Sequence, residues 1–169
     1  MDYAGTAPEI VACLRRGYLY QGQYYAWQRK NRGTRVTHEP ASAFVVYTEN
    51  HDQIANHASG ARLTSAASPA ANRAITAVLL LSAQTPMLFM GQEFGATSPF
   101  NFFADHNPQL RPSVYKGRKA FLAQFPSYAG AAVQKSIPDP AALEAFMRCK
   151  LDFRQRQSHA HYYQFYKAK

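Results

Sequence analysis

Four consecutive polar residues, Glu49, Asn50, His51 and Asp52, follow a short apolar run at residues 43–47. His and Asp side chains can exchange protons with a substrate or hydrogen-bond its hydroxyl groups, and Asn can orient neighbouring backbone. The apolar run predicts a strand covered on both faces. In an α/β barrel, binding and catalytic side chains lie at the carboxyl ends of the strands. This segment therefore predicts a binding or catalytic site.

A second polar pair, Gln92 and Glu93, follows another apolar run at residues 85–90. We expect it on the same face as the first site, because both runs predict parallel strands. Asp105 and His106 are types that bind metals, but no third ligand stands at a metal-binding spacing. We interpret that pair as a loop contact or the wall of a substrate subsite. The sequence predicts no metal site and no cofactor.

The helices and strands that must position these residues are predicted from the positions of Ser, Pro and Gly and from the spacing of apolar residues. Strands are expected at 43–48 and 85–90, and a helix from Ser68-Pro69 to about residue 82 connects them. Strand, helix and strand form a βαβ unit, for which parallel pairing with a right-handed crossover is expected. The other expected elements are an amphipathic helix at 8–20 ending near Gly17, a loop at 21–42, helices at 113–125 and 141–156, and an aromatic tail.

Composition limits the other function classes. The 169 residues suggest one domain, and they fall well short of the roughly 250 of a complete (β/α)8 barrel. The formal charge of +9 is spread along the chain without a nucleic-acid-binding signature, so nucleic acid is not an expected partner. The longest apolar stretch, at residues 74–83, is too short to span a bilayer, so a membrane is not expected either. Cys13 and Cys149 lack a metal or redox spacing and suit a reduced, cytoplasmic protein.

Several ordered motifs resemble the maltooligosyltrehalose trehalohydrolase family, a branch of the α-amylase superfamily (glycoside hydrolase family 13). The motif Asn50-His51-Asp52 alone resembles the superfamily, and the ordered set is specific to the branch. The matching segments are 20–24 (Tyr-Gln-Gly-Gln-Tyr), 50–53 (Asn-His-Asp-Gln), 85–93 (Thr-Pro-Met-Leu-Phe-Met-Gly-Gln-Glu), 102–106 (Phe-Phe-Ala-Asp-His), 116–118 (Lys-Gly-Arg), 138–140 (Pro-Asp-Pro) and 149–152 (Cys-Lys-Leu-Asp).

The resemblance implies a retaining glycosidase that cleaves the α-1,4-glucosidic bond next to the trehalose end of a maltooligosyltrehalose and releases trehalose. It implies that Asp52 is the transition-state-stabilising carboxylate and that His51 donates a hydrogen bond to the same sugar ring. It further implies a maltooligosaccharide-type substrate. The implied substrate-binding residues are Asn50, Gln53, Asn56, Gln92 and Glu93.

The resemblance also implies an α/β fold, a partial (β/α)8 TIM barrel. Residues 1–42 would be helix six and a loop, residues 43–125 would run from strand seven to helix eight, and residues 126–169 would be a C-terminal helical extension. The superfamily nucleophile and general acid are carried by earlier strands and are not found here. We therefore expect a chain truncated at both ends, without the C-terminal β-domain, inactive alone, with the missing barrel segment as a candidate partner.

Three positions depart from the family pattern. Glu49 stands where a Gln is usual, and Ala55 and His57 replace an expected Gly and Arg. The sequence leaves an alternative open, namely a non-catalytic carbohydrate-binding or interaction fragment that uses the same face and its aromatic residues. A basic nucleic-acid-binding domain is the least favoured hypothesis.

Overall fold

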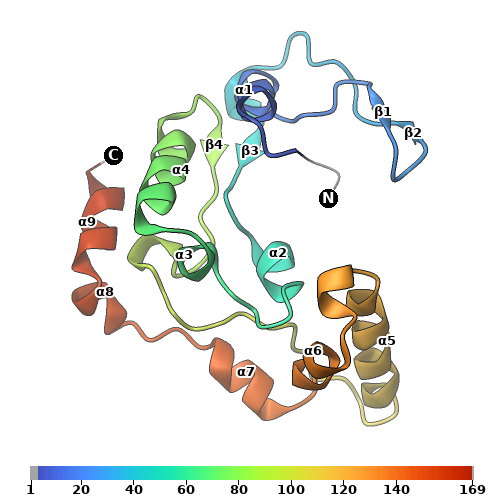
Figure 1. Ribbon diagram of the computed structural model, residues 1–169. Coiled ribbons are helices and arrows are strands. Elements are labelled where there is room, and N and C mark those ends of the chain that lie inside the picture. Colours follow the sequence, from blue (N-terminus) through green and yellow to red (C-terminus); the bar gives the residue numbers. More distant parts are fainter. Residues whose placement is uncertain (1–3, 169) are drawn as a thin grey trace. The chain divides into compact units, whose positions relative to one another are not determined.

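The computed structural model describes residues 4–168, which form two compact units (Figure 1). Within that range the first unit comprises residues 4–47 and 77–87, and the second comprises 48–76 and 88–168. Most regular elements are helices, and the strands are short.

The first unit opens with helix α1 (Ala7–Arg16). Its first turn is closed by Glu9, whose carboxylate accepts a hydrogen bond from the Thr6 amide at 2.9 Å. Its end is set by Gly17, which adopts φ 81°, a conformation that glycine reaches without steric penalty. The predicted amphipathic helix ending near Gly17 is therefore confirmed.

The segment that follows α1 is largely irregular, as predicted for residues 21–42. It contains one antiparallel pair, β1 (Tyr24–Tyr25) with β2 (Lys30–Asn31), and a short 3-10 helix, η1 (Ala41–Ala43). The Arg32 guanidinium lies 4.6 Å from the centre of the Tyr25 ring, so a cation–π contact steadies this hairpin.

The predicted parallel strand pair is present, but it is shorter than expected. Strand β3 (Val45–Val46) pairs in parallel with β4 (Thr85–Pro86). The Thr85 and Met87 amides donate to the carbonyls of residues 44 and 46 at 2.9 and 2.8 Å. Pro86 has no amide to donate, and this register does not require one.

The predicted burial of the first strand is wrong for this chain. Val45 is 55% exposed and Tyr47 is 42% exposed. A parallel strand becomes buried when neighbouring strands and helices cover both its edges and faces. Among the described residues, the sheet holding β3 has two strands, so the apolar side chains of β3 remain accessible.

Three helices separate the two paired strands along the chain: α2 (His51–Ala55), α3 (Leu63–Ala66) and α4 (Pro69–Leu81). Helix α4 begins where the sequence predicts. The Ser68 hydroxyl accepts from the Ala71 amide at 3.2 Å, and Pro69 occupies the first helical position.

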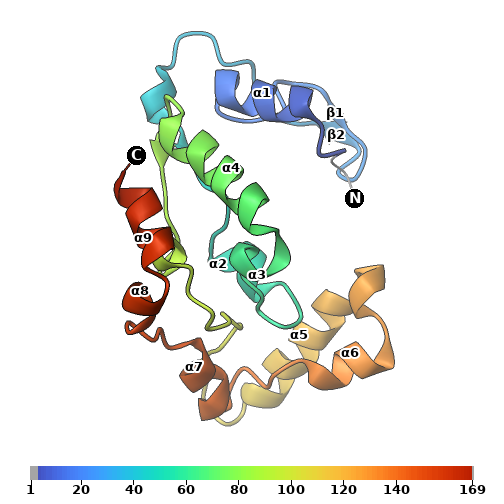
Figure 2. The ribbon, with the colours of Figure 1, turned by 60° about the vertical axis from the view of Figure 1, so that its left-hand side comes forward.

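The second unit continues after β4 with short helices, and Figure 2 shows them from a second direction. They are η2 (Gln92–Phe94), α5 (Arg111–Ala123), η3 (Pro126–Tyr128), α6 (Ala131–Ser136), α7 (Leu143–Cys149), α8 (Gln155–Ser158) and α9 (Ala160–Lys167). Helix α5 confirms the predicted helix at 113–125, and the segment expected as an aromatic tail forms α9.

The predicted helix at 141–156 is wrong as a single element. It breaks at Lys150, which is extended (φ −65°, ψ 134°), so α7 and α8 are separate. The Lys150 carbonyl accepts from the Ser98 hydroxyl at 2.8 Å, which ties this break to a distant segment of the chain. Asp152 then accepts from the Arg154 amide at 3.1 Å, a local turn that starts α8.

The second unit contains the three most completely buried large side chains. Phe94, Ile54 and Leu122 are at most 2% exposed. Ile54 belongs to α2, so the helix that carries His51 and Asp52 is anchored in a core.

Candidate functional site

The polar residues after β3 lie at the start of helix α2, in the second unit. Asn50 is the N-cap, and its Oδ1 atom accepts from the Asp52 amide at 2.8 Å and the Gln53 amide at 3.4 Å. The Gln53 side chain returns the interaction, since its Oε1 atom accepts from the Asn50 amide at 3.0 Å. This reciprocal arrangement is a capping box. It fixes the helix terminus.

His51 and Asp52 occupy the first turn of α2 and point to solvent. Their side chains are 67% and 70% exposed, and the distance from His51 Nε2 to Asp52 Oδ1 is 3.4 Å. Because Asn50 caps the helix, the Asp52 carboxylate is not needed as a cap. The adjacent imidazole and carboxylate can therefore offer a hydrogen-bond donor and an acceptor to the hydroxyl groups of an incoming ligand.

Asn56 ends α2 and contacts helix α5. Its Oδ1 atom accepts from Arg118 Nη1 at 2.5 Å, and Arg118 Nη2 donates to the Ala55 carbonyl. Burial lowers the pKa of the Arg118 guanidinium, whose carbon lies 5.4 Å from the centre of the Phe102 ring. Asn56 is thus engaged in holding α2 against α5.

The Gln92 side chain connects the segments that follow the two strands. It is 4% exposed, its Oε1 atom accepts from the Phe89 amide at 3.1 Å, and its Nε2 atom donates to the Thr48 hydroxyl at 2.8 Å. The expectation that the two segments lie together is met within the second unit. Glu93, the next residue, is half-buried.

Two residues of opposite charge in the segments after β3 and α2, Glu49 and Arg62, are buried. The two residues are 3% and 2% exposed. Glu49 Oε2 accepts from the Leu63 amide at 2.7 Å. Arg62 donates from Nε to the Ser98 carbonyl at 2.7 Å and from Nη1 to the Met90 carbonyl at 2.9 Å. These bonds fasten the loop after β4 to the loop after β3.

Glu49 influences the protonation of Arg62. Burial lowers the pKa of the Arg62 guanidinium, and the negative charge of Glu49 opposes that shift. The departure from the family pattern at Glu49 thus introduces a buried carboxyl group close enough to Arg62 to affect its pKa. Sequence reasoning did not single out Arg62, because a lone Arg in an aperiodic loop gives no sign of burial.

The Asp105-His106 pair lies apart from the contacts just described. Arg111 Nη2 binds Asp105 Oδ1 at 3.0 Å, and the Asp105 side chain is 95% exposed. Within residues 4–168, no three His, Cys, Asp or Glu side chains gather closely enough to hold a metal ion. The structure therefore gives Asp105 a surface ion pair.

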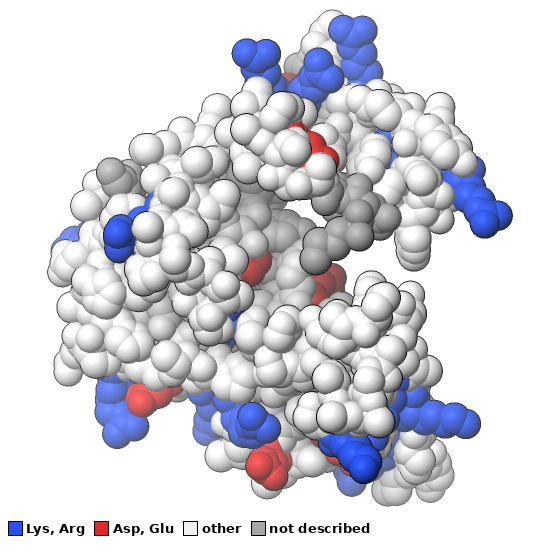
Figure 3. All heavy atoms as spheres, viewed as in Figure 1, with Lys and Arg blue, Asp and Glu red and all other residues white. Residues whose placement is uncertain are grey.

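Basic side chains are dispersed over the face seen in Figure 3, and several acidic ones lie between them. The described residues on that face form no continuous basic stripe of the kind that tracks a phosphate backbone. No helix within the described range is both long and apolar enough to span a bilayer.

Comparison with known proteins shows which enzymes the chain resembles. The chain is 35% identical over 161 residues to malto-oligosyltrehalose trehalohydrolase of Deinococcus radiodurans, a match that covers 94% of this chain and 26% of the relative. It is 38% identical over 169 residues to the Mycobacterium tuberculosis protein of that name, covering 96% and 28% of the two chains. By sequence, nearly the whole chain is similar to malto-oligosyltrehalose trehalohydrolases.

Members of the trehalohydrolase family match this chain through about a quarter of their own length. The structure is also similar to that of a Salmonella typhimurium protein described as an alpha amylase, with a TM-score of 0.87 and 34% identity. That match covers 98% of this chain and 28% of the other. No family model matches the chain. The resemblance seen in the ordered motifs is confirmed, and the fold is part of an alpha-amylase-type fold.

Proposed function

We propose that this chain supplies the transition-state-stabilising corner of a retaining α-glycosidase that releases trehalose from maltooligosyltrehalose. Asp52 accepts hydrogen bonds from the hydroxyls of the sugar ring being cleaved, and His51 donates one to the same ring. The observation that carries the proposal is the free Asp52 carboxylate, 70% exposed beside His51 on a helix start that Asn50 already caps.

The mechanism follows from the charge that develops on the sugar. The ring flattens toward an oxocarbenium ion as the glycosidic bond breaks, and contacts to its hydroxyls strengthen at that point. A carboxylate held on a rigid helix start can stabilise the positive charge that develops on the ring without first having to move. Asn50 and Gln53 supply the rigidity through the capping box, and Glu93 remains a candidate substrate contact.

The strands that precede these residues are part of the proposed barrel. Strands β3 and β4 correspond to strands seven and eight of a (β/α)8 barrel, and their parallel pairing supports that placement. A retaining glycosidase also needs a nucleophile and a general acid about 5–5.5 Å apart. In this proposal, both are supplied by barrel strands outside these 169 residues.

A chimaera tests the proposal. Residues 4–168 replace the matching segment of the Deinococcus radiodurans relative, and trehalose release from a maltooligosyltrehalose is measured. The chimaera should be active, and Asp52→Asn should lower kcat by about 10²–10³ with a smaller change in KM. The control Asp152→Asn alters an exposed ion pair with Arg154 and should leave kcat unchanged.

The purified chain alone should release no trehalose. Trehalose release by the chain alone, abolished by Asp52→Asn, would show that the chain needs no further segment. An active chimaera whose kcat is insensitive to Asp52→Asn would remove Asp52 from the mechanism.

A further inference from the structure

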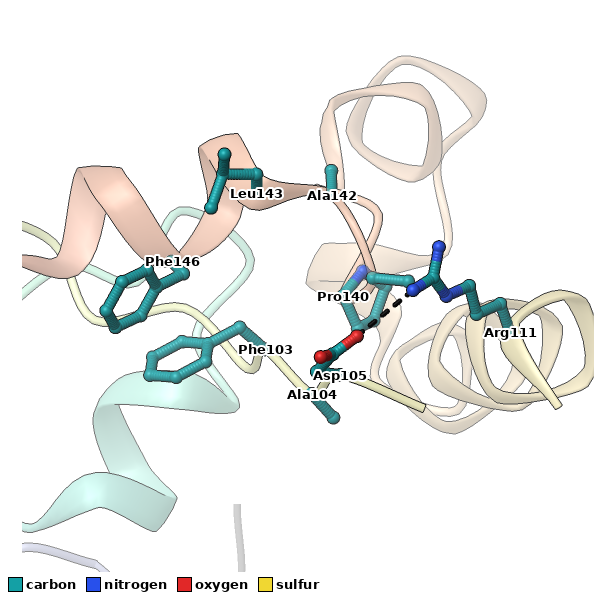
Figure 4. Close-up of a pocket in the computed structure, with 9 residues that line it drawn as sticks. Phe103, Ala104, Asp105, Arg111, Pro140, Ala142, Leu143 and Phe146 are labelled. Atoms are coloured by element: carbon teal, nitrogen blue, oxygen red, sulfur yellow. Dashed lines mark hydrogen bonds and ion pairs between the residues drawn. The ribbon is translucent and has the colours of Figure 1, made fainter. Parts of the chain in front are cut away.

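A cavity of about 650 Å³ lies in the second unit, and neither His51 nor Asp52 is among its lining residues (Figure 4). It is formed by the segment at 103–105, the start of α5 and the segment leading into α7. Its volume falls within the range of about 300–1,000 Å³ that is typical of small-molecule sites. The residues that give it chemical character are Phe103, Asp105, Arg111, Pro140, Leu143 and Phe146.

The walls of this cavity are joined by hydrogen bonds. The Ala104 amide donates to the Pro140 carbonyl at 2.9 Å, which joins the two segments. Asp139 Oδ1 accepts from the Ala141 amide at 3.0 Å and fixes the turn before α7. The cavity is thus preformed, which reduces the entropy lost when a ligand binds.

The polar part of the cavity is the ion pair of Asp105 and Arg111, drawn with a dashed line in Figure 4. Arg111 is held in two places, because its Nε atom donates to the His106 carbonyl at 2.8 Å while Nη2 binds Asp105 Oδ1. These bonds leave Asp105 Oδ2 and Arg111 Nη1 free of this pairing. The carboxylate oxygen can accept a hydrogen bond and the guanidinium nitrogen can donate one, so the two atoms together can bind two adjacent hydroxyl groups.

The charge of the cavity narrows the class of ligand. The negative charge of the Asp105 carboxylate and the positive charge of the Arg111 guanidinium cancel, so the site favours neither an anion nor a cation. Exposed ion pairs of this kind contribute little to folding stability, and Asp105 is 95% exposed. A neutral ligand rich in hydroxyl groups suits the pair better than a charged one.

The apolar part of the cavity is exposed, which is unusual for aromatic and branched side chains. Phe103 and Phe146 meet edge to face, with ring centres 5.2 Å apart. Phe146 is 43% exposed and Leu143 is 73% exposed. Aromatic and apolar surface beside a few fixed polar groups is typical of a ligand site, and it fits the C–H face of a pyranose ring.

We propose that this cavity binds a glucosyl unit of an α-glucan, as a subsite separate from His51 and Asp52. The choice of an α-glucan rests on the proposed function, whereas the neutral, hydroxyl-rich character of the ligand rests on the cavity itself. Asp105 and Arg111 bind adjacent hydroxyls, and Phe103 and Phe146 pack against the ring.

Binding of maltotriose to the full chain tests the proposal, measured by titration calorimetry and saturation-transfer NMR. Asp105→Ala and Phe146→Ala should each weaken binding by about tenfold or more, because each removes a direct contact. Asp152→Asn is the matched control, since Asp152 forms an exposed ion pair with Arg154 that lines no part of the cavity. Asp152→Asn should bind maltotriose like the unchanged chain, whereas Asp105→Ala should weaken binding.

Two results would overturn the subsite. One is the absence of maltotriose binding to the unchanged, folded chain. The other is binding lost in Asp52→Asn and kept in Asp105→Ala, which would place the glucan at the α2 site and leave the proposed function intact. If Phe146→Ala fails to fold by circular dichroism, Asp105→Ala decides alone, because that side chain is 95% exposed.

Discussion

Asn50 and Gln53 each bind the other's backbone amide, so two of the polar residues in the Asn-His-Asp-Gln segment serve the helix they begin. The side chains of His51 and Asp52 take no part in the capping box, and they are 67% and 70% exposed. The motif therefore divides into a part that builds the helix terminus and a part that is free to meet a ligand.

This division predicts that two substitutions in the motif change the free energy of unfolding by different amounts. Asn50→Ala removes the cap and should lower the free energy of unfolding by about 1 kcal/mol. Asp52→Asn should change it by less than about 0.5 kcal/mol, because the exposed carboxylate is not the cap. Urea unfolding followed by circular dichroism measures both. Equal losses in the two variants would contradict the assignment of Asn50 as the cap.

Arg62 and Glu49 should behave as a coupled pair. Arg62→Met leaves the Ser98 and Met90 carbonyls without their donor and Glu49 without a counter-charge, so it should cost about 3 kcal/mol. Glu49→Gln keeps an acceptor for the Leu63 amide but removes the charge.

The double variant Arg62→Met/Glu49→Gln should lose less than the sum of the single changes, by about 1 kcal/mol, when the cycle is measured by chemical unfolding. Additive losses would mean that the two charges do not interact.

Leu122 on α5 should be a main determinant of stability in the second unit. It is 1% exposed, so Leu122→Ala should cost about 2–5 kcal/mol through lost burial and the space left behind. Leu143→Ala is the matched control, because Leu143 is 73% exposed and should change stability by less than about 0.5 kcal/mol. Thermal unfolding of the two variants compares them, and similar losses would argue against the packing of α5.

Tyr166 on α9 should make stability fall at high pH. Burial raises the pKa of its hydroxyl, which lies 3.3 Å from the Thr76 hydroxyl on α4. The unfolded chain releases this proton near pH 10, whereas the folded chain retains it. The contribution is therefore complete below about pH 10 and is lost as the pH rises through the folded-state pKa.

Urea unfolding between about pH 9 and 11 checks this behaviour. Tyr166→Phe should show a smaller decline in stability with rising pH than the unchanged chain, because its ring cannot ionise. Parallel declines in the two proteins would show that Tyr166 is not the group responsible.

The sequence by itself indicated the resemblance to trehalohydrolases, the approximate starts of α1, α4 and α5, and the parallel relation of β3 to β4. These features depend on local chemistry, such as Ser68-Pro69 at a helix start, or on ordered motifs with fixed spacing. It also identified His51 and Asp52, whose role as site residues stays a prediction.

Only the tertiary structure decided which polar residues are occupied and where charge is buried. The break at Lys150 depends on Ser98, and the burial of Arg62 depends on carbonyls at residues 90 and 98. The cavity beside α7 brings Phe103 and Phe146 together from segments about forty residues apart. Such contacts join distant parts of the chain, so no local pattern of residue types encodes them.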